Sequence, residues 1–467
     1  MKLLILFLRW VFNIQLRMGQ WARRHRHFGL AAALLPASGG DITSTTYLPD
    51  AKIVYGMLYN QISTMAALMN LLKDGSKMGK PISNIGLRGY VILCRLTPNW
   101  NLGFRPEGIV GVGQAGVQGL ANGTVVLKYA YVPILITGQA EVLTKGDARA
   151  FMQARALEAK FDAEDITSHL NVIFAGANRG GQLAQTTASG AGTFTADNAG
   201  LLPGAIYLRV GMPIDIGPVG GGALTVQGAT ITAINYTTRV VTHNGGNGGN
   251  GNAVYLSGEA PPTVGTFPYT MECLQSLIDD TVAIQGLDPT VFGQTAWKSL
   301  VKDNGNTTIS PQLLQEQRQF TVNRGGKQPN MYLVPSAQIN QYVGIATTTL
   351  RFDVTWPQGS MGKKALDLGF MVYNFGGLPM IEDKDLRTDR IFCGDGDALR
   401  KFEAVPLSMA EDGASEWTRV SGANGIADAV QGLMRWYIQP GIMQRSAWSR
   451  YQNFTVPTAF QTQPPTL

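Results

Sequence analysis

The sequence predicts a mixed α+β fold, and three observations support this prediction. Two β-type runs, residues 88–96 and 124–136, flank a glycine-rich segment. A long amphipathic pattern over 147–175 has the period of an α-helix. Residues 186–262 hold several short β-type runs separated by turn residues. Because strands and helices do not alternate regularly along the chain, a doubly wound parallel sheet is not expected.

The composition excludes several classes of protein. The 467 residues are 45% hydrophobic and 15% charged, which is too apolar and too weakly charged for a disordered chain. At about 150 residues per domain, the length suggests roughly three structural units. The cysteines Cys94, Cys273 and Cys393 are too few for a disulfide scaffold and lack zinc-type spacing. No uninterrupted apolar run reaches the roughly 18 residues of a membrane-spanning helix, so we expect no membrane partner.

The net positive charge of the chain is concentrated in a basic N-terminal arm, residues 1–46. The formal net charge is +6, and six of the 38 basic residues precede residue 30, where no acidic residue occurs. The rest of the chain therefore holds 32 basic and 32 acidic residues and is formally neutral. Any attraction to a polyanion would come mainly through the arm. The six residues are Lys2, Arg9, Arg17, Arg23, Arg24 and Arg26.

The arm has four competing interpretations, one of which is that an upstream start adds residues with no role. It opens with MKLLILFLRW, a basic residue followed by apolar ones, and Ala31 to Ala33 offer small residues for cleavage, as in a secretory signal. A signal peptide keeps its charges before the apolar core, whereas Arg9 and the basic cluster 23–27 follow it here. A poorly ordered tail and a basic segment that contacts nucleic acid, membrane or a partner are the alternatives.

Residues 47–78 are predicted to form an N-terminal helical region. Apolar residues are dense over 53–72, where Gly56 is the one glycine, and Lys73-Asp74-Gly75 would end the helix.

Residues 79–136 are predicted to form an extended two-stranded excursion. In its second run, Val125, Leu127, Tyr129 and Tyr131 would share one face by the period-two rule. Seven glycines between the two runs leave too little apolar mass for a compact lobe. Because an isolated hairpin is marginal in water, we expect the excursion to need support from a neighbour. The glycines are Gly103, Gly108, Gly111, Gly113, Gly116, Gly119 and Gly123.

The next segment, residues 137–185, contains the clearest helix. Asp147 can cap its start, and Gly176 can end it. About 28 residues at 1.5 Å each give a length of roughly 40 Å. Apolar residues at alternating four- and three-residue steps place one stripe on the helix: Met152, Ala156, Ala159, Ala163, Ile166, Leu170 and Ile173.

Residues 186–262 are predicted to be a small antiparallel β module inserted between α/β segments. The stretch 244–252, NGGNGGNGN, is a flexible loop by composition. The β-type runs of the module are residues 206–210, 224–227, 230–234, 239–242 and 253–256.

The chain after the module returns to a mixture of helices and strands. Helices are predicted over 272–284 and 310–321, and Ser310-Pro311 matches the preferences of a helix start. Strands are predicted at 331–334, 369–373, 378–381, 389–392 and around Phe402.

The motifs that could carry chemistry do not assemble into a site. Gly111 to Gly116 match GxGxxG, but the residues that follow are poor helix formers, so a dinucleotide site is not expected. His169 lies one turn after Asp165, an arrangement typical of a solvated helix contact. The glycosylation-type sequons begin at Asn122, Asn235, Asn306 and Asn453 and carry little weight without an export signal.

An acidic cluster in the C-terminal half is interpreted as a solvated surface loop. Its Asp395-Gly396-Asp397 sequence lacks the rest of a calcium loop. We therefore predict no catalytic, cofactor-binding or metal-binding residues and no cofactor. The cluster consists of Glu382, Asp383, Asp385, Asp389, Asp395 and Asp397.

Several short stretches occur in an order that resembles the major capsid protein of tailed bacteriophages, with its Hong Kong ninety-seven-type shell fold. The resemblance covers most of residues 47–405, and the order of the stretches is more specific than any one of them. The matching stretches are GKPI at 79–82, VVLKYAY at 125–131, ITGQ at 136–139, FAG at 174–176, YLRVGM at 207–212, the 326–335 segment and GLPMI at 377–381.

The resemblance implies a division of labour along the chain. Residues 79–136 would be an extended loop that lies over an adjacent subunit, and 137–185 would carry the spine helix of a peripheral domain. The 186–262 module would decorate the outer face. Residues 263–390 would form the axial domain, and 391–467 would return to the peripheral domain and tail. Some relatives crosslink a loop lysine to a neighbour, but this sequence has no lysine between Lys80 and Lys128.

The function that the resemblance implies is structural rather than enzymatic. The protein would self-assemble through pentamers and hexamers of identical subunits into an icosahedral head shell that encloses double-stranded DNA. Scaffolding, portal or decoration proteins would be further partners, and the basic arm would contact DNA weakly. The expected location is the virion, and the host cytoplasm during assembly. The alternative is a secreted β-rich surface protein or adhesin, exported through its N-terminus.

Overall fold

The structure is a computed structural model, and its described residues begin at Leu68. The N-terminal arm, most of the expected 53–72 helix, the expected cap Asp147 and the GxGxxG stretch lie outside them. The described residues are 68–76, 80–84, 87–99, 118–137, 148–196, 204–261, 269–349, 372–410, 417–422, 425–457 and 460.

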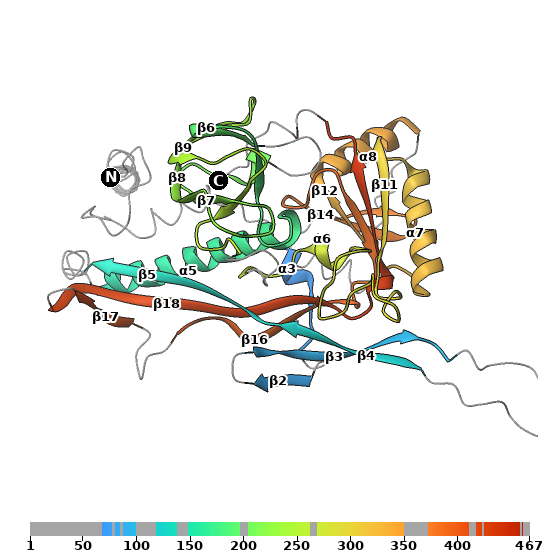
Figure 1. Cartoon of the computed structure of the whole chain (residues 1–467), viewed down its shortest axis with the longest axis horizontal. Coiled ribbons are helices and arrows are strands. Elements are labelled where there is room, and N and C mark those ends of the chain that lie inside the picture. The colour runs from blue at the N-terminus through green and yellow to red at the C-terminus, as the bar shows by residue number, and fades with distance from the viewer. Residues whose placement is uncertain are drawn as a thin grey trace, which may run out of the picture.

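The described residues form a mixed α+β structure that is rich in strands, which confirms the predicted fold class. The strands lie in a five-stranded sheet, a closed barrel, a six-stranded sheet and a three-stranded sheet. Figure 1 shows the barrel and the six-stranded sheet on the same side of the long five-stranded sheet, above its two ends. The longer helices of the described residues are α5 (Ala148–Asn171), α7 (Pro311–Gly325) and α8 (Ser336–Thr349).

The long sheet is organised around β18 (Gly425–Ile442), a strand of 18 residues. It pairs antiparallel with β16 (Leu399–Met409), with β17 (Trp417–Gly422) and with β5 (Lys128–Thr137). The short β1 (Lys73–Asp74) pairs with β16 in parallel. In Figure 1, β5 and β18 run side by side across most of the molecule. Strands far apart in sequence therefore meet in one sheet.

The start of the long sheet follows the end of the N-terminal helix. The described part of this helix, α3 (Leu68–Leu71), ends just before Lys73, as predicted. Lys73 and Asp74 then form β1 rather than a loop. Lys73 also forms an ion pair with Asp397, which lies in the turn directly before β16. The helix end is thus tied to the C-terminal half of the chain.

The predicted excursion is a three-stranded sheet rather than a two-stranded one. β3 (Leu87–Thr97) pairs antiparallel with β4 (Gly119–Val126), in agreement with the predicted runs. β2 (Lys80–Asn84) adds a third strand along β3. Pro81 lies in β2, and a proline without an N–H group is tolerated there because β2 is an edge strand.

The second run of the excursion changes sheets at Leu127, so the predicted common face of its four apolar residues is wrong. Val125 and Leu127 are buried, whereas Tyr129 and Tyr131 are exposed. On β5 the fully buried position is Ile134, an even-numbered residue. The alternation shifts by one residue because β4 pairs with β3, while β5 pairs with β18. A one-residue shift reverses every side chain that follows it.

Helix α5 packs between the barrel and the long sheet (Figure 1). It begins at Ala148, directly after the predicted cap, and continues into a π-helical turn, Val172–Gly176. This turn ends at Gly176, the predicted stop. Within the predicted stripe, Ala159 and Ala163 are half-buried, and the buried residues are Ile166, Leu170 and Ile173.

The glycine-rich zone folds into a closed antiparallel barrel. Its strands follow the order β10-β6-β9-β8-β7 around the barrel. The predicted 206–210 strand is wrong: these residues begin in a 3-10 turn, Gly204–Tyr207, and continue into a tight turn at Gly211, where φ is +88°. The barrel strands are β6 (Ala184–Ala196), β7 (Pro213–Gly217), β8 (Val226–Asn235), β9 (Val240–Asn247) and β10 (Ala253–Leu256).

The C-terminal half forms a six-stranded mixed sheet in the order β11-β19-β15-β12-β14-β13. The β11–β19 and β12–β14 pairs are parallel, and the other pairs are antiparallel. The strands are β11 (Leu300–Thr307), β12 (Met331–Pro335), β13 (Val372–Phe375), β14 (Leu378–Asp383), β15 (Ile391–Gly394) and β19 (Trp448–Phe454).

Helix α7 follows the predicted start signals. The Ser310 hydroxyl accepts a hydrogen bond from the Leu313 N–H at 3.2 Å, and Pro311 occupies the first turn. The helix ends at Gly326, which is left-handed with φ of 65°. Helix α8 was not predicted. A 3-10 turn, Arg445–Ala447, precedes β19.

The helix predicted over 272–284 is reduced to one turn, α6 (Leu274–Leu277). The Asp279 side chain explains the early end. Its Oδ1 accepts hydrogen bonds from the N–H groups of Thr281 and Val282, and its Oδ2 accepts one from Arg450. A side chain that bonds to nearby backbone N–H groups competes with helix propagation.

One large hydrophobic core joins the long sheet, the excursion, α5 and the inner side of the six-stranded sheet. Its largest side chains include Phe402, Trp436 and Trp448. The barrel has its own core, and α7 and α8 cover a third cluster on the six-stranded sheet. The root of the excursion is therefore part of the main core.

We predict that Gly176→Ala destabilises the fold. A Cβ at this position would lie 2.1 Å from Tyr207 Oη and 2.5 Å from the Asp385 carbonyl oxygen. Overpacking of this kind costs about 1–3 kcal/mol, measurable as a lower free energy of unfolding in denaturant. Gly344→Ala is the matched control, because a Cβ there meets nothing within 4 Å. Equal stability of the Gly176 variant and wild type would contradict this packing.

Candidate functional site

The long sheet exposes an apolar stripe, interrupted on β18 by the half-buried Arg435, on the face opposite to α5. Tyr131 and Leu135 of β5 are 51% and 47% exposed, and Leu433 of β18 is also exposed. The register pairs Tyr131 with Arg435 and Leu433 with Pro133, so these side chains share one face. Large apolar side chains grouped on a surface mark a contact site more often than scattered ones do.

Three tyrosines form the fixed centre of this stripe. The Tyr129 and Tyr437 rings meet edge to face with centroids 4.8 Å apart, and the Tyr131 and Tyr437 rings are 5.9 Å apart. The hydroxyls of Tyr131 and Tyr437 lie 3.2 Å apart, and this hydrogen bond, together with burial, raises the pKa of Tyr131 to about 12. Tyrosine combines apolar area with a polar tip, which suits a protein interface.

The opposite face of the same sheet is core. Met434, Trp436 and Ile438 of β18 are buried, and so is Ile134 of β5. This strict alternation along β18 separates the buried face from the exposed stripe. The exposed stripe was not predicted, and residues 433–438, LMRWYI, show no alternation of apolar and polar residues that could have indicated it.

The three-stranded excursion also has one buried and one exposed face. Ile92, Cys94 and Leu96 are buried in the main core, whereas Leu93 is 66% exposed and Leu120 is exposed as well. The expectation that the excursion cannot bury its apolar surface alone is therefore half right. Its root packs on its own chain, and its outer face keeps large apolar side chains in solvent.

Four of the six residues of the acidic cluster are buried, so the interpretation as a solvated surface loop is wrong for them and holds only for the exposed Asp397, with Glu382 half-buried. Asp383 is 1% exposed, and Asp385, Asp389 and Asp395 are buried as well. Each has partners: Asp389 pairs with Arg387 at 3.1 Å, and Asp395 accepts a hydrogen bond from Asn330 at 2.9 Å. Buried carboxylates are stable only when they are paired or protonated. The sequence does not show which arginines would meet them.

Within this cluster, Asp383 and Asp385 share one amide. Asn171, at the end of α5, donates to Asp385 Oδ2 at 2.7 Å and to Asp383 Oδ2 at 3.3 Å. Desolvation by burial, together with the neighbouring Asp385, raises the pKa of Asp383 to about 7. The Asn171 Oδ1 atom has no hydrogen-bond partner. When Asp383 is protonated, its carboxyl group can donate a hydrogen bond, and Asn171 Oδ1 is an acceptor without a partner in the same cluster.

The same region fastens the barrel to the rest of the molecule. The Tyr207 hydroxyl donates to the Asp385 carbonyl at 2.5 Å, and Arg387 donates to Asn178 Oδ1 at 3.1 Å. On the other side of the barrel, His169 Nε2 lies 2.8 Å from Glu259 Oε1. The predicted His169 contact with Asp165 is thus replaced by a tertiary one.

The remaining sequence candidates do not converge on a site. Cys94, Cys273 and Cys393 are free and buried, and burial raises the pKa of each thiol. The sequon residues lie on strands or loops: Asn122 in β4, Asn235 in β8, Asn306 in β11 and Asn453 in β19. Among the described residues, no group of three or more potential ligands is arranged to hold a metal ion.

None of the described helices is both long and apolar enough to span a membrane.

Comparison with known proteins gives structural similarities but no sequence match. No family model matches the chain, and no curated protein does. The capsid asymmetric unit of cyanophage A-1(L) is 9% identical, with 91% of this chain and 98% of that one covered and a TM-score of 0.44. A structure from Gordonia phage Cozz is 12% identical, covers 90% and 98%, and has a TM-score of 0.40. The capsid of an empty GTA particle is 10% identical, covers 84% and 97%, and has a TM-score of 0.37.

These similar structures include capsids, the class of protein that the sequence resembles. Because the TM-scores are below 0.5 and the identities do not exceed 12%, these similarities do not by themselves assign a function to this chain.

We predict that Asp383→Asn changes how stability depends on pH. A carboxyl whose folded pKa is raised to about 7 binds more protons in the folded state than in the unfolded state between about pH 4 and pH 7. Its contribution to stability is therefore fully present below pH 4 and is lost as the pH rises toward 7. The variant should lack this loss. The free energy of unfolding of wild type minus that of the variant, measured in denaturant titrations, should therefore fall between pH 4 and pH 7. A constant difference between pH 4 and 8 would contradict the raised pKa.

Proposed function

We propose that this chain is a structural major capsid protein that self-assembles into the icosahedral head shell of a bacteriophage around double-stranded DNA. The observation that supports this proposal best is the exposed apolar stripe on β5 and β18, together with the outward apolar face of the excursion. Both surfaces belong to strands whose other faces are rooted in the main core.

A second copy of the chain is the partner that suits these surfaces. An excursion that is anchored at its root and exposed on its outer face can lie on an adjacent subunit without unfolding. Contacts between different patches of identical subunits form closed rings when the rotation closes, as in pentamers and hexamers. Edge strand β2 offers unpaired backbone groups that a neighbour can also cover.

In a shell, each segment of the chain would have its own structural role. In this proposal, residues 79–136 reach a neighbour, and α5 is the spine of a peripheral domain over 137–185. The six-stranded sheet belongs to an axial domain over 263–390 that meets its copies around the symmetry axes. The barrel, within 186–262, is an outward decoration, and the C-terminal residues 391–467 return to the peripheral domain.

The proposed role is contact rather than catalysis. Many buried charged groups of the described residues have structural partners: Arg445, for example, donates to the carbonyls of Ser276, Leu277 and Val282. The virion is the location that follows, with the host cytoplasm as the place of assembly. Scaffolding, portal and decoration proteins are further partners in this proposal. No specific observation favours the alternative of a secreted adhesin.

Assembly tests the proposal directly. The full chain is expected to form closed particles, seen by negative-stain microscopy and as a fast boundary in sedimentation velocity. Leu135→Asp should prevent assembly while leaving the subunit folded, because it places a charge in the apolar stripe at an exposed position. Val210→Asp, also at an exposed position but on the barrel, is the matched control and should still assemble.

Two results would count against a shell subunit. One is a folded wild-type chain that stays monomeric at all protein and salt concentrations. The other is normal assembly of Leu135→Asp, which would exclude the stripe as the subunit contact.

The basic arm is proposed to contact the packaged DNA weakly. Residues 1–30 contain six basic residues and no acidic residue, whereas the rest of the chain is formally neutral. Phosphate contacts make binding dependent on salt. Deletion of residues 1–30 should therefore lower DNA retention by the protein and flatten its dependence on salt in a filter-binding assay. Unchanged retention would exclude this role for the arm.

A further inference from the structure

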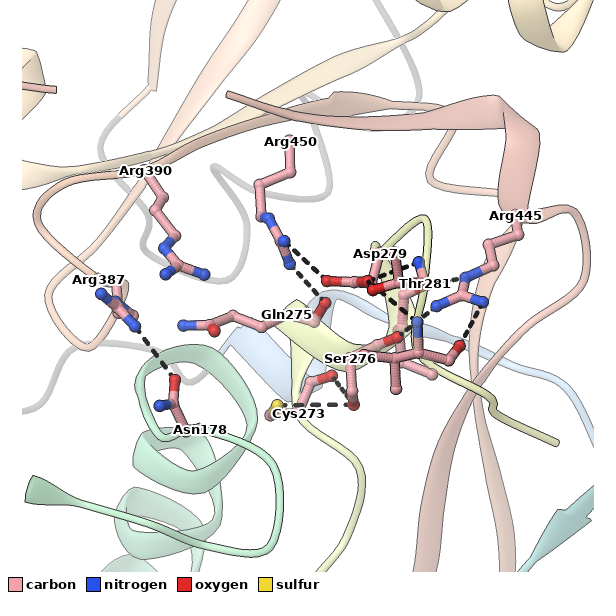
Figure 2. Close-up of polar contacts among 12 residues, drawn as sticks. Asn178, Cys273, Gln275, Ser276, Asp279, Thr281, Arg387, Arg390, Arg445 and Arg450 are labelled. Carbon is pink, nitrogen blue, oxygen red and sulfur yellow. Dashed lines mark hydrogen bonds and ion pairs between the residues drawn. The ribbon is translucent and has the colours of Figure 1, made fainter. Parts of the chain in front are cut away.

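A cavity of about 850 Å³ lies where the barrel, the α6 segment and the six-stranded sheet meet. Its walls include Asn178 beside the barrel, Gln275 of α6 and Arg450 of β19. Figure 2 shows side chains from these separate segments directed toward one another in this region. A cavity of this size can hold a small molecule.

Arginines dominate the charge of the cavity wall. Four arginines line it, Arg179, Arg387, Arg390 and Arg450, against the two acids Glu272 and Asp279. Asp279 pairs with Arg450 at 2.7 Å, and Glu272 pairs with Arg179 at 3.6 Å. The acids of the wall are thus engaged with two of its arginines, and two further positive charges line the cavity.

Arg390 is the least compensated of these arginines. It is 7% exposed, and its Nε atom has no hydrogen-bond partner. This Nε atom lies 3.6 Å from Asp389 Oδ2, an ion pair longer than a hydrogen bond, and Asp389 is held more closely by Arg387 at 3.1 Å. Burial, together with the nearby Arg387, lowers the pKa of Arg390 to about 9. A buried guanidinium without a full set of acceptors is costly.

Two further buried donors in the same wall lack acceptors. The Gln275 Nε2 and Arg450 Nε atoms have no hydrogen-bond partner. In Figure 2 the Gln275 side chain points toward the side where Arg387 and Arg390 are drawn, and no dashed line reaches its amide. All of the unsatisfied side-chain groups of this wall are donors, so they require an acceptor, and the surrounding arginines favour one that carries negative charge.

We infer that this cavity is a binding site for a small oxyanion, a phosphate or carboxylate group carried by a free molecule. Arg390 and the Gln275 amide would donate to its oxygens, and Arg387 and Arg450 would add positive charge from either side. Arginine guanidinium groups suit such oxyanions because they present planar, paired donors. The cavity exceeds the volume of one phosphate ion, so a small phosphorylated or polycarboxylate molecule fits as well. This inference is independent of the proposed shell function.

Thermal unfolding of the full chain tests the site, with inorganic phosphate and citrate as probes. Sodium chloride at matched ionic strength is the reference, because it separates specific binding from screening. A ligand that binds the folded state alone raises the unfolding midpoint, and the added stability grows with the logarithm of its concentration once that exceeds Kd. We expect phosphate or citrate to raise the midpoint above the chloride reference. No difference from chloride for either probe would overturn the inference.

Two variants locate the effect in this cavity. Arg390→Gln should weaken oxyanion binding about tenfold or more and leave the unliganded protein folded, because it removes an undercompensated buried charge. Gln275→Glu supplies a carboxylate from the wall itself. It should raise the midpoint in oxyanion-free buffer and abolish the response to phosphate and citrate.

Arg318→Gln is the matched control. Arg318 lies on α7, donates to the Gly376 carbonyl at 3.0 Å and does not line the cavity. Its response to both probes should equal that of wild type. If Arg390→Gln and Gln275→Glu both keep the full wild-type response, the oxyanions bind elsewhere and the inference fails.

Discussion

The antiparallel pairing of β5 with β18 is the interaction on which the rest of the structure depends. It joins ten residues near the start of the described chain, 128–137, to residues 429–438 near its end. This pairing fixes which face of the long sheet meets α5 and the main core. It also forces the chain to change sheets at Leu127, which reverses the side-chain alternation. The same pairing therefore buries Ile134 and leaves Tyr131 and Leu135 in solvent.

Buried charge is the second constraint on the molecule. Arginines and aspartates from separate segments meet beneath the barrel, and most of them are paired, as Arg387 is with Asp389 and Arg450 with Asp279. Such pairs offset the cost of desolvation only when geometry and hydrogen bonds are complete. Around Arg390 the hydrogen bonds are not complete, and its Nε atom has no hydrogen-bond partner. The barrel is held on the main body by neutral hydrogen bonds as well, such as the one from the Tyr207 hydroxyl to the Asp385 carbonyl.

Periodicity was sufficient to predict the elements whose signals are local. The long helix, α7 with its Ser310 cap, the strand at Met331 and the strands of the excursion all follow from spacing and capping residues. The predictions failed where a distant partner decides. The helix expected over 272–284 stops at Leu277 because Asp279 is engaged by Arg450 and by its own backbone. Asp383 was assigned to the surface because charge alone predicts exposure, whereas its burial is accompanied by a hydrogen bond from Asn171 and a raised pKa.

By itself, the sequence determined the fold class, the neutral body with its basic arm, the long helix and the presence of an extended glycine-rich excursion. These features depend on composition and on neighbours within a few residues. The tertiary structure alone decided that the barrel closes, that four members of the acidic cluster are buried, and that one face of β5 and β18 stays in solvent. Those outcomes depend on pairing between strands and side chains hundreds of residues apart, and no local pattern encodes which partner each one meets.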